Sequence, residues 1–175
     1  MVPPGGIRGG RPSMLGSSRL RPRNWSADGQ ATPVTRSAPQ SAASQGRRRV
    51  LFVCIGNSCR SQMAEAFARA YGSDIVDAQS AGLSPATIIQ HGTLQVMRDR
   101  NISLDGQYPK GLELMAKTVF DVVVNMSGQK LALPGATVID WQVPDPVGRN
   151  DTVYRNVAAQ IEQLVMRLIL ELRGR

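Results

Sequence analysis

The sequence predicts an α/β fold: a single domain built on an open parallel sheet of about four strands, with helices on both faces. Short apolar runs alternate along the chain with longer segments that have helical periodicity. Strands and helices that alternate in this way imply right-handed crossovers, and therefore a parallel sheet that is covered on both sides. We expect this domain to span residues 47–175.

Residues 1–46 are expected to precede the domain as a disordered basic tail. They are rich in Gly, Pro, Ser and Arg and contain no periodic apolar segment. Such a segment buries too little apolar surface to offset the entropy cost of ordering it. It lacks the apolar region of a secretory signal and is loosely similar in composition to an organelle transit peptide. An incorrectly assigned upstream start codon is the alternative explanation, and we expect no part in catalysis.

The formal net charge of +8 belongs to this tail. Residues 1–49 hold nine of the 21 basic residues and one acidic residue, Asp28, so residues 50–175 carry 12 of each sign. We therefore expect no nucleic-acid function for the domain. No apolar run approaches the roughly 18 residues of a membrane span, so no membrane association is expected.

The cysteine content indicates a reducing compartment. The chain has two cysteines, Cys54 and Cys59, which are too few for a scaffold held by disulfides. Together with the one histidine, His91, they also fall short of the four ligands of a structural zinc site. We expect a cytoplasmic protein without a metal site, and His91 is interpreted as a polar residue at a helix end.

The first two elements are a strand at residues 50–53 and a helix at residues 61–71. Val-Leu-Phe-Val is a short apolar run typical of a buried parallel strand. The helix contains strong helix formers throughout, and Gly72 follows as a natural stop. Its expected inward face consists of Met63, Phe67 and Ala70.

The second strand is expected at residues 75–81, where Gly82 ends it. A helix at residues 87–100 follows, and its periodicity places Leu94 and Met97 on the inner face.

A short helix near residues 111–117 precedes strands at residues 120–125 and 137–141. A long amphipathic helix then closes the chain. Its apolar stripe consists of Val157, Ile161, Leu164, Val165, Leu168 and Leu172.

The candidate chemistry lies between the first strand and the first helix. An open parallel sheet binds ligands just beyond the carboxyl ends of its strands. Amides of a loop at this place converge on an anion, and the positive end of the helix dipole reinforces them. Gly56 and Asn57 are residue types that tolerate the unusual backbone angles of such a loop. The candidate anion-binding residues are Ile55, Gly56, Asn57, Ser58, Cys59 and Ser61.

Cys54 and Arg60 stand at the two ends of this loop. The planar guanidinium of Arg60 can grip two oxygens of a tetrahedral oxyanion. The amides, the helix dipole and the guanidinium would stabilise the Cys54 thiolate, which then becomes a nucleophile beneath the bound oxyanion. The alternative interpretation is a buried structural cysteine in an ordinary strand-to-helix turn.

The segment from Val53 to Ala66, Val-Cys-Ile-Gly-Asn-Ser-Cys-Arg-Ser-Gln-Met-Ala-Glu-Ala, resembles the signature of the low-molecular-weight protein tyrosine phosphatase family. Its part from Arg60 to Glu65 is most similar to the arsenate reductase branch of that family. The Ser-Ala-Gly segment that ends at Gly82 and the later Asp145-Pro also match. The resemblance covers roughly residues 48–173.

The resemblance implies a role for each matching residue. Cys54 resembles the nucleophile, Arg60 the phosphate-binding arginine and Asn57 the residue that holds the strained loop. Ser61 resembles the hydroxyl that stabilises the thiolate, and Asp145 resembles the general acid that protonates the leaving oxygen. The implied reaction forms a cysteinyl-phosphate, which water then hydrolyses, without cofactor or metal. For Asp145 a solvated turn residue is the alternative.

The acid segment departs from the tyrosine phosphatase pattern. The resemblance implies an Asp-Pro-Tyr segment at this place in the tyrosine phosphatases. Here Val147 follows the proline, so an aromatic wall for phosphotyrosine is missing. Tyr108, Tyr154 or Trp141 could replace it, although each is also a plausible core or surface residue.

The chain also departs from thioredoxin-coupled arsenate reductases. They have two further cysteines after the third strand, whereas Ser127 stands near that place here. Arsenate reduction would require an external thiol or a disulfide between Cys54 and Cys59. Cys59 is interpreted either as a redox guard of the nucleophile or as a small buried hydrophobe.

Three functions remain open. The leading one is hydrolysis of phosphomonoesters, including phosphotyrosine, in a phosphorylated protein or a small ester. The second is arsenate reduction with an external thiol or a glutaredoxin-type partner. The third is oxyanion binding without turnover, which the presence of Cys54, Arg60 and Asp145 together disfavours. We expect a monomer.

Overall fold

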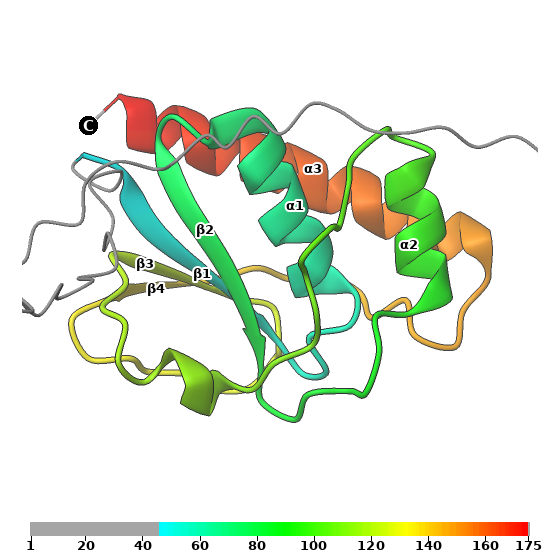
Figure 1. Cartoon of the computed structure of the whole chain (residues 1–175), viewed down its shortest axis with the longest axis horizontal. Helices are drawn as coiled ribbons and strands as arrows, with labels where there is room; N and C mark the ends of the chain where they lie inside the picture. Colours follow the sequence, from blue (N-terminus) through cyan, green and yellow to red (C-terminus); the bar gives the residue numbers. More distant parts are fainter. Residues whose placement is uncertain (1–45, 175) are drawn as a thin grey trace, which may run out of the picture. The chain divides into compact units, whose positions relative to one another are not determined.

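The structure is a computed structural model that describes residues 46–174, so the expected tail at residues 1–46 lies outside the described residues except for Gly46. A four-stranded sheet, three α-helices and one 3-10 helix make up the described chain (Figure 1). None of these helices is long and apolar enough to cross a membrane. In chain order the elements are β1 (Arg48–Cys54), α1 (Arg60–Gly72), β2 (Val76–Gly82), α2 (His91–Arg98), η1 (Leu112–Met115), β3 (Val122–Asn125), β4 (Thr137–Asp140) and α3 (Asp151–Arg173).

All strands of the sheet are parallel, in the order β2-β1-β3-β4. The predicted α/β class is confirmed. Because β1 pairs with β2 on one side and with β3 on the other, the connections diverge at β1. In an open α/β sheet this switch point opens the crevice in which ligands bind. Cys54 ends β1 opposite Gly82 and therefore lies at this crevice.

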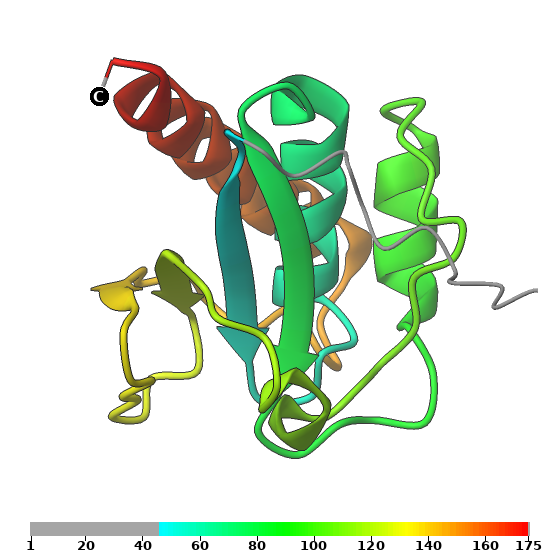
Figure 2. The same cartoon turned by 60° about the vertical axis from the view of Figure 1, so that its left-hand side comes forward.

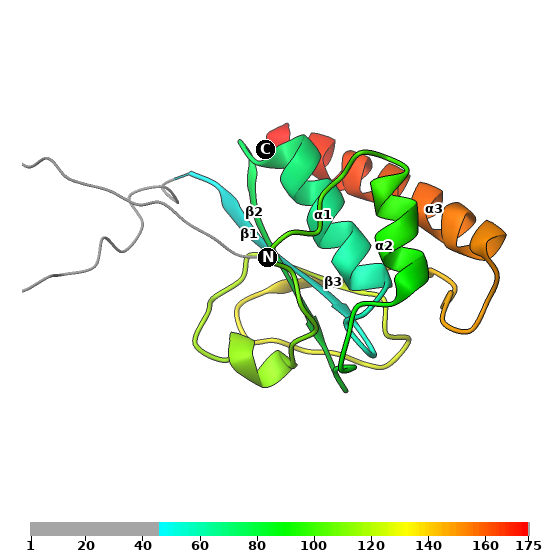
Figure 3. The ribbon, with the colours of Figure 1, turned by 45° about the vertical axis from the view of Figure 1, so that its right-hand side comes forward.

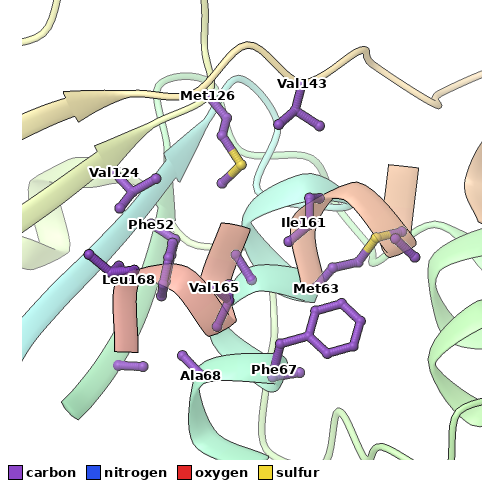
Figure 4. Close-up of a cluster of buried hydrophobic side chains, with 14 of the residues drawn as sticks. Phe52, Met63, Phe67, Ala68, Val124, Met126, Val143, Ile161, Val165 and Leu168 are labelled. Atoms are coloured by element: carbon purple, nitrogen blue, oxygen red, sulfur yellow. The ribbon is translucent and has the colours of Figure 1, made fainter. Parts of the chain in front are cut away.

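All three α-helices lie on one side of the sheet, as Figures 2 and 3 show, with α2 packed against α1 and α3. Successive strand residues point to opposite faces, so Phe52 and Val124 face these helices. They belong to one core cluster with Met63 and Phe67 of α1 and Val165 of α3 (Figure 4). The main core thus fixes α1, and with it the start of α1, against β1.

The other face carries a smaller core beneath η1 and the segment that precedes β4. Leu51, Val53 and Val123 point to this side and pack with Met115 and Phe120. All three α-helices thus lie on one side of the sheet, whereas the other face carries only the short 3-10 helix η1 and loop segments, so the expectation of helices on both faces is met only by η1 there.

The helix predicted at residues 87–100 is shorter, and its inner face differs from the prediction. Helix α2 begins at His91 and buries Thr93, Val96 and Met97, whereas Leu94 is 38% exposed. Thr93 is buried because its hydroxyl donates to the backbone carbonyl of Ser58, 3.2 Å away. This bond turns the helix so that Leu94 faces outward.

The two long helices follow their predicted patterns closely. Helix α1 ends at Gly72, although Ala70, which was predicted to be buried, is exposed on its last turn. Helix α3 begins after Asn150, whose side-chain oxygen accepts from the amide of Val153 at 3.1 Å.

Candidate active site

The loop that joins β1 to α1 spans residues 54–60 and lies at the crevice. Gly82 of β2 stands directly beside it. A Cβ atom on Gly82 would lie 2.7 Å from the carbonyl oxygen of Ile55 and 3.0 Å from the amide nitrogen of Asn57. The loop therefore approaches β2 as closely as it does because residue 82 has no side chain.

The Cys54 side chain is directed into this loop. Its Sγ accepts from the amide of Asn57 at 3.2 Å and lies 3.0 Å from the Ser61 Oγ. The Asn57 Nδ2 donates to the same Ser61 Oγ at 2.8 Å, which leaves the hydroxyl hydrogen free for sulfur. The amide of Asn57 and the hydroxyl of Ser61 thus both lie within hydrogen-bond distance of the Cys54 sulfur.

Asn57 is the central residue of the loop. It is fully buried and has a φ of 46°, in the left-handed region that non-glycine residues rarely adopt. Its Nδ2 also donates to the Ser80 Oγ at 2.9 Å, while its Oδ1 accepts from the amide of Lys110 at 2.8 Å and from Gln62 at 3.1 Å. These bonds hold the residue in its unfavourable conformation.

Behind Asn57 lies a buried polar cluster that the sequence analysis missed. The Ser80 hydroxyl donates to Glu65 of α1, which is itself fully buried. Glu65 forms ion pairs with Arg69 and with Lys110, whose Nζ lies 3.6 Å from the carboxylate. The sequence offers little signal for this cluster, because Glu65 lies away from the apolar face of Met63 and Phe67, on the side of the polar Gln62.

Arg60 is fixed at the start of α1. Its Nη1 donates to the carbonyl oxygens of Met126 at 2.8 Å and Val143 at 3.2 Å, and its Nη2 donates to the carboxylate of Asp145. The residue is 7% exposed. The segments that follow β3 and β4 therefore hold the guanidinium beside the loop.

Asp145 lies on the segment between β4 and α3. Its second oxygen accepts from the amide of Val147 at 3.1 Å, and its side chain is 45% exposed. A cavity of about 260 Å³ opens at this point. It is lined by Cys54, Ile55, Gly56, Ser58, Cys59 and Arg60 of the loop and by Ala86, Gln90, Asp145 and Val147.

The structure thus brings Cys54, Arg60 and Asp145 together at one cavity, although 85 residues separate Arg60 from Asp145. Asn57 and Ser61 lie beneath the cavity, in contact with Cys54. Such a site can bind a tetrahedral oxyanion on amides and a guanidinium, with a sulfur nucleophile below it and a carboxylate at its rim.

None of the three candidate aromatic residues lines this cavity. The Tyr154 hydroxyl lies 3.8 Å from the Cys59 Sγ, in the interior. The Trp141 ring packs 5.9 Å from that of Phe52. Tyr108 is 58% exposed, with the Lys110 ammonium over its ring. The cavity lining outside the loop, which consists of Ala86, Gln90, Asp145 and Val147, is aliphatic and polar.

Cys59 differs from Cys54 in its surroundings. Burial raises the pKa of the Cys59 thiol, and the nearby Asp145 carboxylate acts in the same direction. Both cysteines are free. Cys59 therefore stays a thiol near neutral pH.

Two further expectations concern single residues. His91 is the first residue of α2 and is exposed there, as its interpretation as a helix-end residue requires. Ser127 donates its hydroxyl to the Oδ1 of Asn125 at 2.6 Å, within a turn just after β3. Across residues 46–174 no group of three or more His, Cys, Asp or Glu side chains is placed to hold a metal ion.

Comparison with known proteins places this site in a family context. The family model described as low molecular weight phosphotyrosine protein phosphatase matches residues 49–175. A glutaredoxin arsenate reductase of Synechocystis sp. is 35% identical over 131 residues, which are 71% of this chain and 98% of that protein.

Solved structures give the same result. An arsenate reductase in its phosphate-binding state has a TM-score of 0.65 and 34% sequence identity, over 71% of this chain and 98% of that one. A low molecular weight protein tyrosine phosphatase from T. tengcongensis has a TM-score of 0.61 and 26% identity, over 71% and 99% of the two chains. The relatives thus include both a phosphatase and arsenate reductases.

Proposed function

The chain belongs to the low molecular weight phosphotyrosine protein phosphatase family, and from this we propose that it is a cysteine-dependent phosphomonoester hydrolase. The observation that carries the proposal is the meeting of Cys54, Arg60 and Asp145 at one cavity. A pure oxyanion-binding module needs neither a sulfur nucleophile nor a proton donor.

The proposed reaction has two steps. The Cys54 sulfur attacks phosphorus, and the bond from phosphorus to the ester oxygen breaks while Asp145 gives that oxygen a proton. Water then attacks the cysteinyl-phosphate, with Asp145 taking up a proton, and releases inorganic phosphate. The loop amides and Arg60 carry the charge on the equatorial oxygens throughout. Ser61, 3.0 Å from the sulfur, stabilises the thiolate as it leaves.

The missing aromatic wall bears on the substrate. Ala86, Gln90 and Val147 form the upper cavity lining, which gives a phenyl ring little to stack against. A phosphorylated protein or a small phosphate ester therefore fits the site without a marked preference for phosphotyrosine. We further propose that the enzyme is a monomer of the reducing cytoplasm, where two free thiols persist.

A second function, arsenate reduction, is favoured by the 35% identity to a glutaredoxin arsenate reductase. In that reaction Cys54 would displace water from arsenate to form a sulfur–arsenic bond. A second thiol would then attack the Cys54 sulfur, forming a disulfide while the electron pair of the sulfur–arsenic bond stays on arsenic as arsenite. Because its pKa is raised, Cys59 is a poor attacking thiolate. An external thiol, either a small thiol or a glutaredoxin-type partner, is therefore favoured.

Two assays on the same preparation test the proposal. We expect hydrolysis of para-nitrophenyl phosphate without reductant, and loss of that activity in Cys54→Ser, because a hydroxyl is not ionised near neutral pH. Arsenate reduction that requires glutathione and glutaredoxin, without phosphatase turnover, would replace the first function by the second. Oxyanion binding with neither activity would leave only the binding module.

A further inference from the structure

The hydrogen bonds of Arg60 leave little of the guanidinium for a ligand. A guanidinium offers five N–H groups. Both carbonyl contacts, to Met126 and Val143, are made by Nη1, so that end is committed to the protein. The remaining edge, Nε and Nη2, must serve an oxyanion, and there Nη2 donates to Asp145. The carboxylate stands where the arginine would meet its substrate.

A carboxylate and a phosphate or arsenate oxyanion bind to an arginine in the same way. Both offer negatively charged oxygen acceptors, and both suit the planar fork of the guanidinium. They also repel each other at close range. The ion pair between Arg60 and Asp145 therefore competes with the binding of substrate.

We propose that Asp145 is an internal counter-anion of Arg60, and that the substrate oxyanion must displace its carboxylate before the reaction begins. The proposal rests on the proposed function for the nature of the ligand, a tetrahedral oxyanion. It gives Asp145 a role that precedes its proposed role in proton transfer.

The surroundings of the two residues decide which of them moves. The Arg60 side chain is 8% exposed and is held by two carbonyl groups besides Asp145. The Asp145 side chain is 45% exposed and lies in residues 141–150, which contain no helix or strand. Arg60 therefore stays in place and Asp145 leaves.

This order links binding to proton transfer. In the structure both Asp145 oxygens are engaged, one by Arg60 and the other by the amide of Val147, so neither is free to act on a leaving oxygen. The arrival of the oxyanion releases the Asp145 carboxylate, which becomes the proton donor once it has taken up a proton from the bound monoanion or from water. An empty site keeps its buried arginine paired, which avoids an uncompensated charge in the interior.

Inorganic sulfate is a suitable probe because it is tetrahedral, divalent and not hydrolysed. Its Kd is measured with the full chain by titration of backbone amide NMR signals. We expect Asp145→Ala to bind sulfate about fivefold more tightly than the wild type, the upper range for removing a partly exposed ion-pair partner. Glu171→Gln, which changes the charge equally on an exposed position of α3, should leave the Kd unchanged. Equal or weaker binding by Asp145→Ala overturns the proposal.

Hydrogen exchange separates displacement from a simple loss of repulsion. Sulfate should slow amide exchange in residues 54–60 and speed it in residues 142–149 of the wild type, because the Asp145 segment loses its anchor. In Asp145→Ala exchange in residues 142–149 should be fast with or without sulfate. If sulfate protects the loop but leaves residues 142–149 unchanged or slower, the displacement is wrong while the proposed function stands. If sulfate binds neither protein, both are wrong.

Discussion

Gly82 offers a sharp test of how the fold shapes the loop. In Gly82→Ala the new Cβ would lie 2.7 Å from the Ile55 carbonyl oxygen, whereas ordinary contacts begin at 3.4 Å. The loop and β2 must therefore separate by about 0.7 Å at this point. Backbone atoms on both sides of the contact leave no flexible side chain to absorb the shift.

The expected loss follows from this displacement. A misplacement of about 1 Å in a reacting group can cost about a hundredfold in rate. We expect Gly82→Ala to lower kcat/KM for para-nitrophenyl phosphate by about 10- to 100-fold. Overpacking should also lower the free energy of unfolding by about 1–3 kcal/mol. About 0.4–1 kcal/mol of this loss should be recovered, because alanine restricts the unfolded chain more than glycine does.

Gly72→Ala is the matched control. There the new Cβ would also meet an atom at 2.7 Å, but this atom is the Cδ1 of Ile169, the end of a flexible side chain in α3. Gly72 ends α1 at the end opposite to the loop. This variant should lose stability by a similar or smaller amount and keep its kcat/KM.

Steady-state kinetics and urea unfolding of both variants decide the matter. Rates are compared per active site, counted by stoichiometric alkylation of Cys54. If Gly82→Ala loses stability but retains a near-normal kcat/KM, as Gly72→Ala should, the close contact between β2 and the loop does not shape the site.

Three further predictions concern the cavity residues. Arg60→Lys should lower kcat/KM by about a hundredfold or more, because an ammonium cannot make the forked contact to two oxygens; near-normal kinetics would argue against an oxyanion cradle. Asp145→Asn should slow phosphoenzyme formation about a hundredfold for an alkyl phosphate and far less for para-nitrophenyl phosphate, since a good leaving group needs no acid; equal slowing in pre-steady-state bursts would exclude that role. Burial raises the pKa of Cys59 above its ordinary value of 9.0, so its contribution to stability is present below pH 9 and is lost as the pH rises further. The free energy of unfolding should thus fall more steeply above pH 9 in the wild type than in Cys59→Ala, and parallel curves from urea unfolding would contradict this.

The fold could be predicted from the sequence because its signals are local. The apolar run at residues 50–53 and the helix formers at residues 61–71 each indicate one element, and their alternation along the chain implies parallel strands. The inner face of α2 could not be predicted in this way. Thr93 turns inward because of a bond to the carbonyl of Ser58, which lies in the loop between β1 and α1.

The same contrast holds within the site. The loop lies in one contiguous segment, so Cys54 and Arg60 could be recognised together. The contact of Arg60 with Asp145 joins segments 85 residues apart and follows only from the placement of β4 beside β3. The buried bond from Ser80 to Glu65 likewise depends on how α1 lies against β2. No periodicity in the sequence carries such information.

The segment after β3 determines where a reducing thiol would have to come from. Asn125 occupies the turn there: its Oδ1 accepts from the hydroxyl of Ser127, and its Nδ2 donates to Asp140 at 2.7 Å and to the carbonyl of Gln129 at 2.8 Å. These bonds close the turn on itself, and no cysteine lies in it. A thiol from outside the chain would therefore reach the Cys54 sulfur through the cavity that Asp145 lines. If the chain reduces arsenate, the displacement of Asp145 by the oxyanion would also clear the path for the thiol that follows it.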